Sequence, residues 1–254
     1  IMEGGTAMNR VGIQFLGSGD AFGSGDRLQS CILVKYEGTQ FLIDCGASSL
    51  IGMNHCCINP NDIKIILISH LHADHFGGIP FFIIASQLIF KRTEPLLIEG
   101  PPGMKERLAQ AMEVMFPGSS GVKRKFNIEV EEFSDGIPLI ADEIIITPYM
   151  NSHVPIDSSF ALRVECNGKI IAYSGDTEWV KSLYEAAKNS DLFISEAYNF
   201  EKKVKGHMDY QTLIQNYEKT GAKNLILTHM SNDMLSNLDK VNCEYAEDGK
   251  VFEI

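Results

Sequence analysis

The chain has 254 residues, of which 44% are apolar and 22% charged, and its 22 Lys and Arg against 33 Asp and Glu give a net charge of −11. This composition excludes disordered and fibrous proteins. The acidic balance disfavours nucleic-acid binding unless a local basic patch is present. The longest apolar run, 79–90, is far shorter than the roughly 20 residues of a membrane span, so the sequence predicts no membrane insertion.

The first eight residues lack a basic region followed by an apolar core, so we expect no signal peptide. Because Ile1 precedes Met2, we expect 1–7 to be an expression remnant and Met8 to be the natural start. None of the six cysteines forms a C-x-x-C pair, which is typical of reduced thiols in a cytoplasmic protein. No linker or repeat divides the chain, which predicts one domain over 8–254.

Ten short apolar and β-branched runs predict strands. Turn dipeptides at Glu37-Gly38 and Asn167-Gly168 predict hairpins, and therefore antiparallel pairing in the first and third quarters of the chain. The predicted strands, in chain order, are 11–16, 31–34, 41–43, 63–68, 96–98, 143–147, 160–164, 170–173, 192–195 and 225–228.

Helical periodicity appears in four segments: 76–90, 103–116, 179–188 and 210–219. The first is apolar nearly all round, which predicts burial between layers. Asp176-Thr177-Glu178 and Asp209 predict capped starts for the last two. Hairpin strands mixed with helices predict an α+β protein of two packed sheets with helices outside.

Four side chains that can bind metals follow the predicted strand 63–68: His70, His72, Asp74 and His75. In an extended chain His70 and His72 point to the same side, and a turn after them can bring the other two to a neighbouring point. Two clusters a few ångströms apart suit a two-metal site. The spacing differs from that of a helical H-E-x-x-H zinc site.

This H-x-H-x-D-H stretch resembles the signature of the metallo-β-lactamase superfamily, and the remaining ligands of that pattern follow in order at later strand ends. The resemblance implies a four-layer αββα sandwich with two metals at one edge of the sheets. The implied ligands are His70, His72 and His153 for one metal, Asp74, His75 and His229 for the other, and Asp176 as the bridge between them.

Nitrogen and oxygen ligands without thiolates suit zinc, and residue type equally admits manganese or iron. The resemblance implies a hydroxide held between two divalent ions as the nucleophile. Asp74 is then a candidate to orient or deprotonate that water. Asp44, which ends the strand 41–43, is a candidate to hold a ligand imidazole, and a turn-forming role is left open.

Several segments resemble the ribonuclease Z group of tRNA-processing endonucleases and its armless phosphodiesterase relatives. They are FLGSGD at 15–20, LIDCG at 42–46, GPPG at 100–103 and SFALR at 159–163. At the places where that group has an acidic residue and an extra histidine, this chain has Glu196 and His207. The resemblance implies that His207 is a general acid oriented by Glu196. A helix-capping role for His207 and a surface position for Glu196 remain alternatives.

The chain departs from ribonuclease Z in two places. It has no sequence for the basic, glycine-rich tRNA-gripping arm, and it reads Met230-Ser231-Asn232-Asp233 where the group has F-S-x-R. With the acidic charge, this favours a small or nucleotide-type phosphodiester as substrate. The alternatives, in decreasing order, are a metal-dependent thioester, lactone or β-lactam hydrolase, a tRNA 3′-processing endonuclease, and a non-enzymatic scaffold.

Weaker signals stay open. The glycine-rich loop 17–25 lacks the G-x-G-x-x-G spacing and is predicted to form a turn at the metal edge. Lys123-Arg124-Lys125 is predicted to be a solvated hairpin edge, with phosphate contact as the alternative. The segment 79–90 is compatible with a homodimer interface and with core burial. The aromatic residues that either line the cleft or pack in the core are Tyr149, Tyr198 and Phe200.

Overall fold

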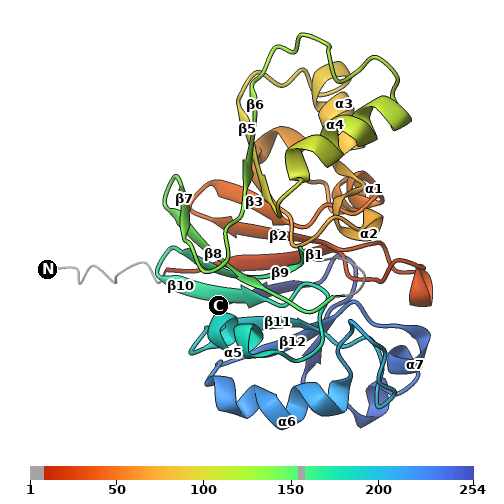
Figure 1. The fold of residues 1–254 in the computed structure, drawn as a ribbon, viewed down its shortest axis with the longest axis vertical. Coiled ribbons are helices and arrows are strands. Elements are labelled where there is room, and N and C mark those ends of the chain that lie inside the picture. Colours follow the sequence, from red (N-terminus) through yellow and green to blue (C-terminus); the bar gives the residue numbers. More distant parts are fainter. Residues whose placement is uncertain (1–8, 154–157) are drawn as a thin grey trace, which may run out of the picture.

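A computed structural model describes residues 9–153 and 158–254 (Figure 1). The predicted remnant at 1–7 and the predicted start at Met8 lie outside the described residues. Two seven-stranded sheets form the centre of the molecule, and helices cover their outer faces, which confirms the predicted α+β, four-layer αββα arrangement. No helix in the described ranges is long and apolar enough to cross a membrane.

The first sheet has the strand order β14-β1-β2-β3-β4-β5-β6. β14, β1, β2 and β3 pair antiparallel, and β3 to β6 pair parallel. The β2–β3 turn places Glu37 and Gly38 at φ 43° and 80°, so the predicted hairpin is confirmed. The strands are β1 (Gly12–Gly17), β2 (Cys31–Tyr36), β3 (Thr39–Ile43), β4 (Ile63–Leu67), β5 (Leu96–Gly100), β6 (Ile128–Glu132) and β14 (Val251–Glu253).

The second sheet has the order β13-β12-β11-β10-β9-β8-β7. β7 to β10 pair antiparallel and β10 to β13 pair parallel. Asn167 and Gly168, at φ 47° and 71°, form the other predicted hairpin. The strands are β7 (Leu139–Ala141), β8 (Ile144–Met150), β9 (Phe160–Cys166), β10 (Lys169–Tyr173), β11 (Leu192–Glu196), β12 (Leu225–Thr228) and β13 (Glu244–Tyr245).

Three apolar cores separate the four layers. One lies between the sheets, one between the first sheet and its helices, and one between the second sheet and its helices. Burial on both faces explains why the central strands read as continuous apolar runs. The first sheet is covered by α1 (Ser49–His55), α2 (Ala73–Phe76), α3 (Ile79–Leu88) and α4 (Met104–Met115), and the second by α5 (Lys181–Ala187), α6 (Tyr210–Thr220) and α7 (Asn232–Leu235).

The predicted long helix over 76–90 is wrong in two respects. Gly77 and Gly78 separate it into α2 and α3, and α3 lies in the outer layer rather than between layers. Its outward side chains Phe81, Leu88 and Ile89 are 41%, 55% and 71% exposed. Although α3 has apolar side chains on every face, only the face toward the first sheet is buried.

Two local predictions were also wrong, and one was confirmed. α5 begins at Lys181 without a side-chain cap, because Val180, which has no polar side-chain atom, stands at its N-cap position. The run 123–125 lies in the loop between α4 and β6, and β6 pairs parallel with β5, so it is not a hairpin edge. Asp209 caps α6 as predicted, accepting from the N–H of Thr212 at 2.8 Å.

Candidate metal centre

The seven predicted ligands come together at one edge of the two sheets. The segment 70–75 follows β4, while His153, Asp176 and His229 follow β8, β10 and β12. His229 adopts φ 56°, a left-handed conformation that is rare outside glycine and is often found where a side chain must be aimed at a functional site. All seven side chains are buried except that of His72, which is partly exposed.

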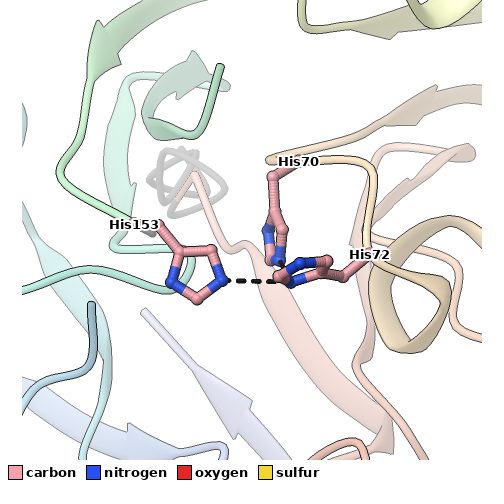
Figure 2. Close-up of side chains that lie close together, drawn as sticks. All are labelled: His70, His72 and His153. Atoms are coloured by element: carbon pink, nitrogen blue, oxygen red, sulfur yellow. Dashed lines mark hydrogen bonds between the residues drawn. The ribbon is translucent and has the colours of Figure 1, made fainter. Parts of the chain in front are cut away.

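Three imidazoles form the first cluster (Figure 2). His72 Nδ1 lies 3.1 Å from His70 Nε2 and 3.0 Å from His153 Nε2. His153 Nδ1 donates to the carbonyl of Gly206 at 2.7 Å, so its Nε2 is the nitrogen that faces the cluster. Burial, and then the charge of His75, hold the pKa of His70 well below its usual value. Three imidazole nitrogens this close together could serve as ligands of a single cation.

Two further histidines and a carboxylate form the second cluster. Asp74 Oδ2 lies 3.2 Å from His75 Nε2 and 3.1 Å from His229 Nε2. Burial lowers the pKa of His229, but Asp176, Asp74 and Glu196 outweigh it and raise that pKa to about 10. The surplus of buried carboxylate therefore attracts positive charge to this point, as a proton or as a metal ion.

Asp176 lies between the clusters. Its Oδ1 is 3.3 Å from His75 Nε2, and its Oδ2 is 3.5 Å from His229 Nε2 and 3.9 Å from His70 Nε2. Burial raises the pKa of Asp176, but His229 and His75 outweigh it and hold that pKa well below its usual range. Among the described residues, Oδ1 has no hydrogen-bond partner although it is buried. This donor set fits two divalent ions joined by one carboxylate.

Asp44 supports the second cluster. Its Oδ2 accepts from His75 Nδ1 at 2.7 Å and from the Tyr173 hydroxyl at 2.8 Å. Its carboxylate also accepts from the N–H and hydroxyl of Ser69, at 2.8 and 2.9 Å. The geometry favours holding a ligand imidazole over forming a turn. Sequence reasoning missed Tyr173, and no local signal could have found it, because it lies 129 residues from Asp44.

Glu196 and His207 form a hydrogen-bonded pair beside Asp176. Glu196 is fully buried at the end of β11, where its Oε2 accepts from the N–H groups of Thr177 and Met208 at 3.0 and 3.1 Å. Its Oε1 accepts from His207 Nδ1. Burial lowers the pKa of His207, but the bond to Glu196 outweighs it and raises that pKa. Because Glu196 is buried and Asp209, not His207, caps α6, the surface alternative for Glu196 and the capping alternative for His207 are wrong.

A cavity of about 290 Å³ opens onto these groups. Tyr198 lines it, with its ring stacked on His207 at 4.6 Å. Phe200 instead stacks on Tyr210 at 5.4 Å, and Tyr149 packs against the core beneath α5 and α6. The cavity is lined by Ala21, Phe22, His72, Ala73, Asp74, Asp176, Tyr198, His207 and His229.

Comparisons with known proteins agree with this geometry. The sequence model of the family described as anti-Pycsar protein Apyc1 matches residues 11–252. A ribonuclease Z of Anoxybacillus flavithermus is 26% identical over 273 residues, covering 85% of this chain and 86% of the relative. The crystal structure of the metallo-β-lactamase fold protein YhfI from Bacillus subtilis has a TM-score of 0.78 and 22% identity, covering 96% of this chain and all of the other. Human tRNase Z, short form, has a TM-score of 0.76 and 24% identity, covering 95% and 98%. The predicted resemblance to the superfamily and its ribonuclease Z-like branch is confirmed.

Proposed function

The chain belongs to the family described as anti-Pycsar protein Apyc1 and is a metal-dependent hydrolase, and from this premise we propose that it is a dinuclear phosphodiesterase acting on a small or nucleotide-type phosphodiester. The observation that carries the proposal is the position of Asp176 between two clusters of nitrogen and oxygen donors. His70, His72 and His153 would hold one ion, and Asp74, His75 and His229 the other. Zinc suits these donors best.

Two divalent ions supply a nucleophile at neutral pH and neutralise charge on the phosphate. Asp74 would orient the attacking water. Burial raises the pKa of its carboxyl, but His75 and His229 outweigh burial and hold it well below the usual range. Asp74 is therefore ionised and acts as a hydrogen-bond acceptor, and it is too weak a base to hold a proton taken from water.

His207 would protonate the leaving oxygen. Its Nδ1 is engaged by Glu196, which leaves Nε2 for the substrate, and the bond to Glu196 raises the pKa of the ring and so favours its protonated form. Glu196 is itself held by two backbone N–H groups, so the imidazole has a fixed orientation. A charged acid of this kind matters most when the leaving group is poor.

The size of the cavity and the net charge of the chain favour a small substrate. The cavity measures about 290 Å³, at the lower end for small-molecule sites. The net charge of −11 disfavours a long polyanion. The matched relatives are named ribonuclease Z, and another structural neighbour is named a diphosphatase of the PhnP family. We therefore place small diesters ahead of tRNA as substrates.

Metal analysis combined with substrate profiling tests the proposal. We expect about two metal equivalents per chain, and turnover of bis(p-nitrophenyl) phosphate and of a cyclic nucleoside monophosphate. Acyl-CoA, a lactone, a β-lactam and a precursor tRNA serve as the comparison substrates. Turnover of a carbonyl substrate without turnover of any diester would contradict the proposal, and so would a chain that binds no metal.

A further inference from the structure

Phe22 stands at the mouth of the candidate cavity with its ring in solvent. It is 83% exposed, the highest value for a large apolar side chain in the described parts of the chain. The same cavity is lined by Asp74, Asp176 and His207. Because Phe22 is both exposed and part of the cavity lining, its ring is available to pack on a ligand bound there, which would remove apolar surface from water.

The loop that carries Phe22 is tightly held. Asp20, 1% exposed, accepts from the N–H of Phe22 at 3.1 Å and from the N–H and hydroxyl of Ser24 at 3.0 and 2.7 Å. The loop also packs closely on α7, since a Cβ at Gly25 would lie 2.7 Å from Leu235 Cδ1. These hydrogen bonds and contacts fix the loop in the conformation that exposes the ring. Little backbone entropy of the loop would therefore be lost when a ligand binds.

A second aromatic ring lines the same cavity. Tyr198 stacks on His207 with an interplanar angle of 27°. The cavity thus has a floor of histidines and carboxylates, and aromatic groups on its walls. This combination suits a ligand with a phosphate at one end and a flat ring at the other, because base–aromatic stacking is strong and tolerant of base identity.

We propose that Phe22 is a specificity-determining residue that stacks on the nucleobase of a nucleotide-type phosphodiester whose phosphate lies at the histidine and aspartate clusters. The proposal rests on the proposed function and names its substrate class. Stacking on Phe22 would favour diesters that carry a base over diesters of the same phosphate chemistry that lack one. It places no strong demand on which base is present.

Calorimetric binding to the metal-loaded protein tests this role independently of turnover. The probes are adenosine 5′-monophosphate and ribose 5-phosphate, which share the sugar and phosphate and differ in the base. For Phe22→Ala we expect about tenfold weaker binding of adenosine 5′-monophosphate and unchanged binding of ribose 5-phosphate. Phe22→Tyr should restore binding, and Phe22→Leu, which keeps apolar bulk without a ring, should not. Phe81→Ala, an exposed phenylalanine of α3 that is not among the cavity-lining residues, is the matched control and should change neither value.

Equal weakening of both probes, full binding by Phe22→Leu, or no binding of adenosine 5′-monophosphate to the parent protein would overturn the stacking role. Each substitution changes an exposed side chain, so we expect the variants to fold. Failure of the proposed function has a different outcome, namely no hydrolysis of any diester by the metal-loaded parent protein. The two failures are therefore distinguishable.

Discussion

The two sheets follow the same strand plan but contribute to the site in different ways. In each, antiparallel strands give way to parallel strands covered by helices. The first sheet supplies four of the seven candidate ligands from the single segment 70–75 after β4. The second supplies one residue after each of β8, β10 and β12, with Glu196 at the end of β11.

This difference separates two ways of building a site. The first sheet delivers its donors through one short turn, so their mutual distances depend on local backbone geometry. The second sheet delivers them from three strand ends, so their distances depend on strand register and on the core between the sheets. If both sheets serve one dinuclear site, changes in either should affect the same metals.

Asp176 offers the largest test, because it is the one candidate that lies between both clusters. We expect Asp176→Ala to lose metal from both clusters and to lower diester turnover at least about 1000-fold. His72→Ala, in the first cluster only, should lose about one equivalent. Elemental analysis and steady-state kinetics measure both effects, with circular dichroism as the folding control. If Asp176→Ala kept two metal equivalents per chain, the idea that Asp176 joins the two clusters in one site would be contradicted.

His207 tests whether the second sheet contributes chemistry as well as ligands. We expect His207→Ala to slow an alkyl-leaving diester by about 100- to 10,000-fold and bis(p-nitrophenyl) phosphate far less, because an activated leaving group needs little protonation. Glu196→Gln should give a smaller loss in the same direction and lower the pH at which activity falls, since it removes the charge that raises the pKa of His207. Equal losses on both substrates would rule out the general-acid role.

Asp44 tests the support that the first sheet gives to its own segment. Asp44→Asn should weaken metal affinity by about 10- to 100-fold, because it weakens the acceptor that orients His75. Tyr173→Phe, which removes only a hydroxyl donor to the same carboxylate, should have a smaller effect. Competition with a chromogenic chelator measures both affinities. Unchanged affinity in Asp44→Asn would mean that the turn alone orients the imidazole.

Glu99 is a buried carboxyl in β5 of the first sheet. It is 1% exposed, and burial together with Glu131 raises its pKa to about 7. The folded state therefore keeps a proton that the unfolded chain loses from about pH 4.5 upward, so stability falls as the pH rises from 5 to 7. Glu99→Gln should raise the free energy of unfolding by about 2 kcal/mol at pH 8 and leave it nearly unchanged at pH 4. Urea unfolding checks this, with the exposed Glu129→Gln as control, and an equal gain at both pH values would contradict it.

The smallest expected effect is at a helix start in the layer behind the second sheet. Asp209→Ala removes the side-chain cap of α6 and should lower the free energy of unfolding by about 1 kcal/mol. Asp209→Asn should retain most of that stability. α4, behind the first sheet, starts at Gly103 without a side-chain cap, so Gly103 offers no comparable cap to remove. Thermal unfolding of the two Asp209 variants compares them directly.

Prediction from sequence succeeded where the physical cause is local. All ten predicted strands are present, because strands buried on both faces leave continuous apolar runs. Four strands were not predicted: three of the five residues of β6 are exposed glutamates, and β7, β13 and β14 have only three, two and three residues. The predicted cap of α6 is present, whereas the predicted capped start of α5 was wrong, because Val180 at its N-cap position has no side-chain acceptor.

The sequence by itself determined the turn 70–75, the order of the later donors and the two hairpins, because each depends on residues that are neighbours along the chain. Only the tertiary structure decided that Asp176 lies between the clusters, that Asp44 holds His75, and that Phe22 stands at the cavity mouth. Those relations are distances between segments many residues apart. They exist only after the two sheets have packed against each other, and the residue pattern of a single segment does not specify that packing.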